Sequence, residues 1–175
     1  MKAGIAIGAG AGVVGGLVAA AVLSILGIKG HEGQIARAIT LVSHLVGSSG
    51  VVAGWLVQVA VSTAIGALFG VLYTALGLHR ETAAWWATLY GIAWWIVGSF
   101  AVMSPALRLA PWEALEDPRR FQMVLAGLLA CLSVGTALAG AFTLFGPIER
   151  SPSEARPRSR RLAPPSNGTL TTRRR

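Results

Sequence analysis

Charged side chains are almost missing from most of this sequence. Only 13% of the residues are Asp, Glu, Lys or Arg, and the stretches 3–28, 38–78, 82–107 and 121–148 contain none of them. A hydrocarbon core about 30 Å thick is crossed by roughly 20 apolar residues in a helix, and a charge at its centre costs roughly 2.5 to 3.5 kcal/mol. Each stretch is long enough for one crossing, so the sequence predicts an integral membrane protein.

Residues that carry out chemistry are also scarce. Cys131 is the only cysteine, which excludes an intrachain disulfide and a cysteine-based metal site. His31, His44 and His79 fall outside the expected crossings, whereas a membrane haem needs axial ligands on facing helices. The crossings hold no carboxylate, Lys or Arg for proton transfer or hydrolysis. We therefore predict no enzymatic activity, no metal and no cofactor.

We predict an all-α membrane protein with four transmembrane helices. The second uncharged stretch is too long for one crossing, and the small residues of 47–50 (GSSG) divide it. Pro105 marks the end of the third crossing. The expected crossings are residues 3–28, 51–78, 82–106 and 121–147, within one transmembrane domain over 1–148.

A short amphipathic helix is expected between the first two crossings, over residues 34–46. Ile35, Ile39, Val42 and Val46 recur at helical spacing, and polar residues lie off this stripe. A helix with one apolar and one polar face lies along a membrane surface rather than across it. We therefore expect this helix at the interface.

Basic residues are unevenly shared between the two sides of the predicted bundle. Four crossings place both chain ends on one side, which holds Lys2, Arg80 and eight arginines after residue 148, ten in all. The other side holds the remaining five. Lys and Arg accumulate in cytoplasmic loops of membrane proteins. Both termini are therefore predicted to be cytoplasmic.

Residues 149–175 have the composition of a disordered tail. They contain eight arginines, two glutamates and many Pro and Ser residues, with few apolar side chains to bury. Such a tail either only fixes the topology or also contacts anionic lipid headgroups. The candidates for lipid contact are Arg150, Arg156, Arg158, Arg160 and Arg161. We expect no specific binding to nucleic acid, because charge alone gives weak, salt-dependent contacts.

Glycine recurs every fourth residue along the first crossing, at Gly4, Gly8, Gly12 and Gly16. In a helix this spacing places the glycines on one face, where another helix can approach closely. Because lipid tails are as apolar as leucine, close packing rather than hydrophobic burial makes helices associate in a bilayer. The partner is either another helix of this chain or a second copy, so a homo-oligomer or a larger membrane complex stays open.

Small and polar residues form two further stripes. The second crossing carries Gln58, Ser62, Gly66, Gly70 and Thr74 at four-residue intervals, and the fourth carries Ser133, Thr136, Gly140 and Thr143. We expect the two stripes to pack together through interhelical hydrogen bonds, with Gly66 and Gly70 as packing residues. The alternative is a narrow polar path for a small neutral solute that includes Gln58, Ser62 and Thr136.

The third crossing is rich in aromatic residues. Trp85 and Trp86 suit the aromatic belt at the cytoplasmic interface. Trp94 and Trp95 fall deeper in the membrane, where each indole N–H needs a partner. These side chains either hydrogen-bond to neighbouring helices or form, with Tyr90, a pocket for a lipid, a quinone or another hydrophobic ligand.

Two sets of short motifs resemble those of a known family. The first set is GWLVQ at 54–58 with GALFG at 66–70, and the second is LYGIAWWIVG at 89–98 followed by VMSP at 102–105. They resemble a family of small uncharacterised bacterial four-helix inner-membrane proteins, over roughly residues 4–146. The resemblance implies a four-helix fold and a place in the bacterial inner (cytoplasmic) membrane, without an established activity.

The function expected from these features is that of a non-enzymatic structural or accessory subunit in the lipid bilayer. Two alternatives stay open. One is a channel or carrier for a small neutral or lipophilic solute, through Gln58, Ser62 and Trp94. The other is a protein that binds lipid or quinone on the aromatic face of the third crossing.

Overall fold

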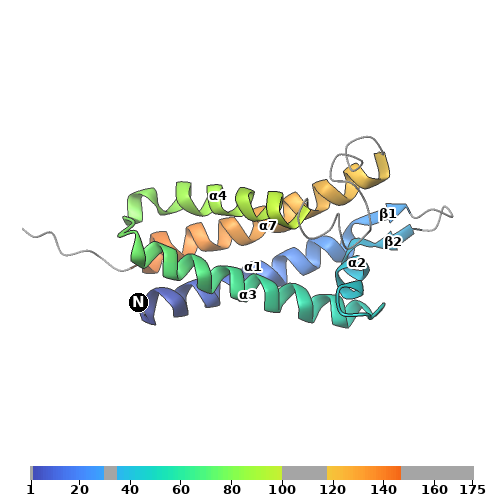
Figure 1. Cartoon of the computed structure of the whole chain (residues 1–175), viewed down its shortest axis with the longest axis horizontal. Coiled ribbons are helices and arrows are strands. Elements are labelled where there is room, and N and C mark those ends of the chain that lie inside the picture. The colour runs from blue at the N-terminus through green and yellow to red at the C-terminus, as the bar shows by residue number, and fades with distance from the viewer. Residues whose placement is uncertain (1, 30–34, 100–117, 147–175) are drawn as a thin grey trace, which may run out of the picture.

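The computed structural model describes residues 2–29, 35–99 and 118–146, which are mostly helical and include one pair of three-residue strands. The elements are α1 (Lys2–Ile25), β1 (Gly27–Lys29), β2 (Ile35–Arg37), α2 (Ala38–His44), α3 (Val51–Ala75), α4 (Arg80–Ile96) and α7 (Pro118–Phe145). The four long helices lie side by side and alternate in direction (Figure 1). The start of α1, the end of α7 and the turn at 76–79 therefore share one end of the bundle.

The long helices follow a spatial order that differs from their order in the sequence. α1 packs against both α3 and α7, and α4 packs against α7, which gives the order α3, α1, α7, α4. The short α2 contacts α3 and runs across the opposite end of the bundle, next to the β1–β2 pair (Figure 1). α1 and α7 are thus the two central helices.

Two glycines in the left-handed region end helices and reverse the chain. Gly77 has a φ of 59°, and the next N–H, that of Leu78, donates to the Tyr73 carbonyl at 3.0 Å, which satisfies a carbonyl left open at the end of α3. After α2, Gly47 has a φ of 68° and Ser48 N–H donates to the Ser43 carbonyl at 3.1 Å. Glycine reaches this conformation without the steric penalty of a Cβ.

The sequence-based boundaries at the β-strand end are wrong. α1 ends at Ile25 rather than at residue 28, and residues 35–37, assigned above to the interfacial helix, form a strand instead. β1 and β2 pair antiparallel, with Gly27 opposite Arg37, and Ala38 N–H donates to the Leu26 carbonyl at 2.9 Å. Pairing the two segments satisfies backbone groups that a broken helix would leave open.

The expected apolar stripe of α2 is only partly present. Ile39 and Val42 are buried, whereas Val46 follows the end of the helix and is 58% exposed. The helix therefore begins at Ala38, later than the expected start at 34, and ends at His44.

The other boundaries differ less. α4 begins at Arg80 and ends at Ile96, followed by one π-helical turn at 97–99. α7 begins at Pro118, three residues before the expected start, and ends at Phe145. The expected end of the third crossing at 106, and the tail at 149–175 with its predicted disorder, lie outside the described residues.

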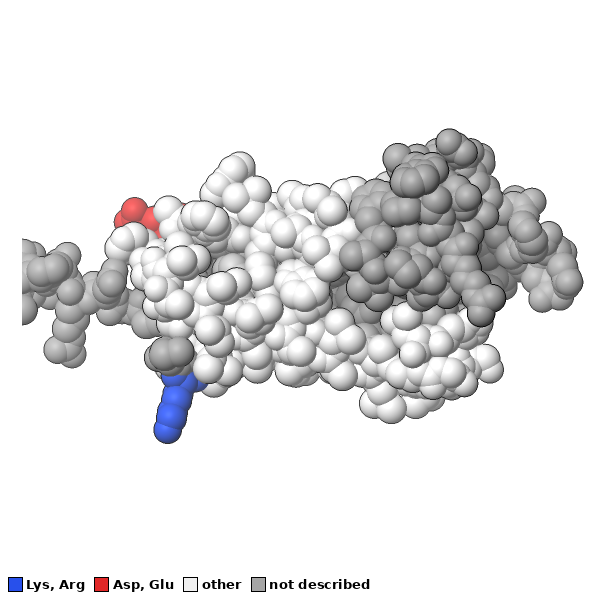
Figure 2. All heavy atoms as spheres, in the orientation of Figure 1, with Lys and Arg blue, Asp and Glu red and all other residues white. Residues whose placement is uncertain are grey.

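The described chain has the surface of an integral membrane protein. α1, α3 and the segment Phe121–Phe145 are each long and apolar enough to cross a membrane. Large apolar side chains are exposed along them, with exposed fractions of 58% for Val14, 73% for Val52 and 68% for Leu56. A soluble monomer rarely exposes such continuous apolar surface. On the face that Figure 2 shows, the described side chains along the bundle are uncharged, and charged atoms appear at its left end.

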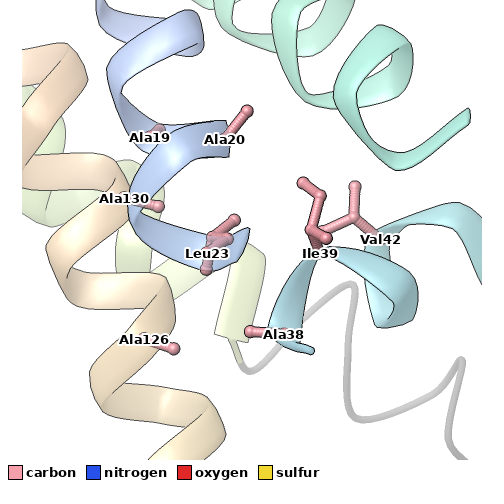
Figure 3. Packing of buried hydrophobic residues seen from close by; sticks show 8 residues of the cluster. All are labelled: Ala19, Ala20, Leu23, Ala38, Ile39, Val42, Ala126 and Ala130. Carbon is pink, nitrogen blue, oxygen red and sulfur yellow. The ribbon is translucent and has the colours of Figure 1, made fainter. Parts of the chain in front are cut away.

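Buried apolar side chains form two clusters, one towards each end of the bundle. At the β-strand end, Ile39 and Val42 of α2 lie near Leu23 of α1, and small residues of α1 and α7 complete the cluster (Figure 3). At the other end, aromatic residues of α3 and α7 pack with alanines of α4. The first cluster joins α2 to the bundle, and the second joins α3 to α4 and α7.

Candidate functional site

The closest helix contact in the bundle joins the glycines of α1 to small residues of α3. We call it the glycine seam, and its members are Gly4, Gly8, Gly12 and Gly16 of α1 with Ser62, Gly66 and Gly70 of α3. A methyl group on Gly8 would overlap the Gly66 carbonyl oxygen, and a methyl group on Gly66 would overlap the Gly8 carbonyl oxygen. The two backbones therefore touch directly, without intervening side chains.

The glycine seam has a regular antiparallel register. Gly4 faces Gly70, Gly8 faces Gly66 and Gly12 faces Ser62, so each step of four residues along α1 matches four residues back along α3. The face that the sequence analysis singled out on the first crossing is thus covered by a helix of the same chain. Self-association through this face would require α3 to leave it.

The expected pairing of the two polar stripes is wrong. The stripe of α3 meets α1, and α3 and α7 have few contacts. On α7 the hydroxyls of Ser133 and Thr136 each donate at 2.8 Å to the carbonyl four residues earlier in their own helix, and Thr143 does the same. Such internal bonds satisfy a hydroxyl without an interhelical partner, so these residues do not require a second polar helix.

The residues of the alternative polar path are not brought together. Gln58 Nε2 donates to Ser62 Oγ at 3.2 Å, and Ser62 is 1% exposed against Gly16 of α1. Thr136 instead lies on the exposed side of α7. The Gln58–Ser62 pair is therefore part of the contact between α1 and α3.

Tryptophan N–H groups link the helices in pairs. Trp95 Nε1 donates to the Val124 carbonyl at 2.9 Å and so joins α4 to α7, as the need for a deep indole partner suggests. Trp55 Nε1 donates to Ser24 Oγ at 2.9 Å and joins α3 to α1. The sequence did not predict the bond between Trp55 and Ser24, although Ser24 continues the four-residue spacing of Gly4, Gly8, Gly12 and Gly16.

Aromatic rings of α3, α4 and α7 pack against one another. We call Phe69, Tyr73, Tyr90, Trp94 and Phe142 the aromatic cluster. The Phe69 ring lies 5.0 Å from the Tyr90 ring, centroid to centroid, and the Tyr90 and Trp94 rings meet edge to face at 6.2 Å. Tyr90 Oη also donates to the Ile65 carbonyl at 2.8 Å. Tyr90 and Trp94, two residues of the predicted pocket, thus contact each other, and Phe69 packs against Tyr90.

A second close contact, between α4 and α7, also escaped the sequence analysis. Ala83 and Ala87 of α4 are fully buried, and Gly91 continues their four-residue spacing. A methyl group on Gly91 would lie 3.1 Å from the Cys131 carbonyl oxygen, and one on Gly135 would lie 3.2 Å from that of Ala87. The four-residue spacing of small residues in α4 could have predicted this contact, but the sequence analysis of this segment considered only its aromatic residues.

Groups that could hold a metal do not gather in the described ranges, where no three His, Cys, Asp or Glu side chains come together. A shallow hollow of about 310 Å³ is lined by His44, Gly47, Ser48 and Ser49, in the connection from α2 to α3. The arginines Arg150, Arg156, Arg158, Arg160 and Arg161, predicted to contact lipid headgroups, lie outside the described residues.

No protein-family model, curated protein or solved structure matches this chain. The resemblance to a bacterial four-helix family therefore stays a prediction from the motifs at 54–70 and 89–105.

Proposed function

We propose that the chain is a bacterial inner-membrane protein with four crossings that acts as a non-enzymatic structural or accessory subunit. The support is that several of its polar side chains form hydrogen bonds to other residues of the bundle. Gln58, Trp55, Tyr90 and Trp95 each donate a hydrogen bond within the bundle, to Ser62, Ser24, Ile65 and Val124 respectively. The bonds of Trp55, Tyr90 and Trp95 each join two helices, whereas Gln58 and Ser62 both belong to α3. The large apolar side chains on the outside are left to contact lipid or another membrane protein.

In this proposal α4 is the third crossing and α2 the interfacial helix. The described part of this crossing is helical from 80 to 99, about 30 Å at 1.5 Å per residue, and the predicted crossing continues to residue 106. α4 lies alongside α7 (Figure 1). α2 crosses the end of the bundle, buries Ile39 and Val42, and exposes His44. One apolar and one polar face suit a helix that lies in the interface.

The charges at the two ends support cytoplasmic termini. Lys2 and Arg80 lie at the end of the bundle where the described termini lie, and the arginine-rich residues 149–175 follow from that end. In the proposal these basic residues face the cytoplasm and the anionic inner leaflet. The β-strand end, with Arg37, then faces the other side.

The topology can be tested with single cysteines in a Cys131→Ala background. Ser49→Cys lies in the connection from α2 to α3 and His79→Cys lies in the turn before α4, at opposite ends of the bundle. We expect a membrane-impermeant maleimide to label Ser49→Cys in intact spheroplasts and His79→Cys only after permeabilisation. Equal labelling of both positions in intact spheroplasts would contradict the crossing of α3.

The subunit function can be tested with a photocrosslinking amino acid on each lipid-exposed face. Suitable positions are Val14, Leu56, Leu89 and Leu129, with one on each long helix and exposed fractions of 58%, 68%, 39% and 46%. The control is Leu138, which is fully buried. We expect at least one exposed position to give a discrete protein adduct in native membranes, and Leu138 to give none. Lipid adducts alone at all four exposed positions would contradict a subunit function.

The alternatives have less support. A polar path would need Gln58, Ser62 and Thr136 to line one passage, but Gln58 and Ser62 lie in the contact between α1 and α3, and Thr136 is exposed on α7. A lipid- or quinone-binding function has one observation in its favour, since Tyr90 and Trp94 remain half-exposed beside Phe69. In the crosslinking experiment, lipid or quinone binding would give a small-molecule adduct at Leu89 of α4 and no protein adduct at the other positions.

A further inference from the structure

Arg80 links the two ends of the second helical hairpin. It is the first residue of α4, and a terminal N–H of its guanidinium, on Nη2, donates to the Leu144 carbonyl oxygen in the last turn of α7. The last four carbonyls of a helix have no partner within that helix, and they carry the negative end of its dipole. Arg80 therefore satisfies one of these carbonyls and places its charge favourably.

This contact orients the guanidinium without neutralising its charge. The Leu144 carbonyl is the one partner of Arg80 among the described residues, and Nε is buried without a hydrogen-bond partner. The side chain is only half-buried, and a guanidinium has five N–H donors in a planar fork. The remaining donors on the terminal nitrogens therefore have no acceptor among the described residues, and they could bond to an acceptor outside them.

The neighbouring tryptophans indicate how deep Arg80 lies. Trp85 and Trp86 are 66% and 42% exposed, and they follow Arg80 by five and six residues, or about 8 Å along the helix. Exposed tryptophans collect at the boundary between hydrocarbon and headgroups. If α4 crosses the membrane as in the proposed function, on which this inference rests, Arg80 lies about 8 Å outside that boundary, at the level of the lipid phosphates.

We propose that Arg80 binds the phosphate group of an anionic phospholipid in the cytoplasmic leaflet. The planar fork of a guanidinium matches a phosphate group with two parallel hydrogen bonds, which a lysine ammonium does not provide. Lys2 lies at the same end of the bundle and adds positive charge there. This site belongs to the folded bundle and is separate from the arginines of the tail.

The experiment uses the full-length protein in nanodiscs that contain equal amounts of phosphatidylglycerol and phosphatidylcholine. The phosphatidylglycerol carries a photoactivatable headgroup, and the adducts are mapped by peptide mass spectrometry. We expect adducts within residues 79–86 of the wild type and about a tenfold loss of them in Arg80→Gln, because a charge-assisted hydrogen bond is removed. Arg80→Lys, which keeps the charge, is expected to lose fewer adducts.

Arg37→Gln is the matched control, because Arg37 lies at the opposite end of the bundle. It should leave the adducts at 79–86 unchanged, and Arg80→Gln should leave adducts in the tail unchanged. Wild-type adducts confined to the tail would overturn the proposal even if Arg80→Gln fails to fold. Loss of the adducts on addition of millimolar inorganic phosphate would replace a lipid site with a soluble-phosphate site. The cysteine labelling described above tests the crossing of the membrane independently of these outcomes.

Discussion

Gly8→Ala should lower the free energy of unfolding by about 2 to 3 kcal/mol, because the added methyl group has no space in the glycine seam. It would overlap the carbonyl oxygen of Gly66, and backbone cannot move aside as the end of a flexible side chain can. α1 and α3 would have to separate, which would weaken the other contacts of the glycine seam. The measurement is a titration of SDS into a mild detergent, with unfolding followed by tryptophan fluorescence.

Gly10→Ala is the control on the same helix, since a methyl group at Gly10 meets nothing within 4 Å. Its free energy of unfolding should stay within about 0.5 kcal/mol of the wild type, as is usual for a surface substitution without new contacts. A general effect of replacing glycine in a transmembrane helix would change both variants equally. Equal stability of Gly8→Ala and Gly10→Ala would show that α1 and α3 are not in this close contact.

Phe142→Ala should lower the free energy of unfolding by about 2 kcal/mol. Phe142 is fully buried, and its ring lies 5.2 Å from that of Phe69 and 4.4 Å from that of Tyr73. In a water-soluble protein a buried Phe→Ala change costs about 3 to 5 kcal/mol, partly because unfolding exposes the ring to water. In a bilayer the unfolded helix leaves the ring in lipid, so only the packing part of that cost remains.

The control for Phe142→Ala is Phe145→Ala, on the last turn of the same helix. Phe145 is 70% exposed, so its removal should leave the stability within about 0.5 kcal/mol of the wild type. The same SDS titration serves for both variants. If Phe145→Ala proved the more destabilising of the two, the aromatic cluster would not be the contact that joins α3 to α7.

The sequence indicated which residues lie in close helix contacts, but it did not indicate which helix they contact. The spacing of Gly4, Gly8, Gly12 and Gly16 defines one helix face, since only the helical repeat is needed for that inference. The partner of that face depends on the spatial order of the helices, which no local pattern contains. The matching spacing of Ser62, Gly66 and Gly70 could have indicated α3, but the hydroxyls of the expected fourth crossing suggested α7 as well.

The ends of the elements were predicted less well than their interiors. Absence of charge locates a crossing but does not say where an apolar chain stops being helical, as residues 26–29 show. There Gly27 follows the end of α1, and the segment pairs with residues 35–37. This pairing is non-local, whereas the apolar spacing of Ile35, Ile39 and Val42 fits a helix. Tertiary pairing therefore overrode a local pattern, as it commonly does for short segments.

The spatial order α3, α1, α7, α4 has a consequence for how the protein is made. The contact between α1 and α3 can form as soon as Ala75 has left the ribosome, because both helices then exist. α4 must wait, because the face formed by Ala83, Ala87 and Gly91 packs against α7, which is synthesised after α4. At about 5 to 20 residues per second this wait lasts about 2 to 10 s. During that time α1 and α3 can already be packed together, whereas α4 is still without the helix that it contacts in the folded protein.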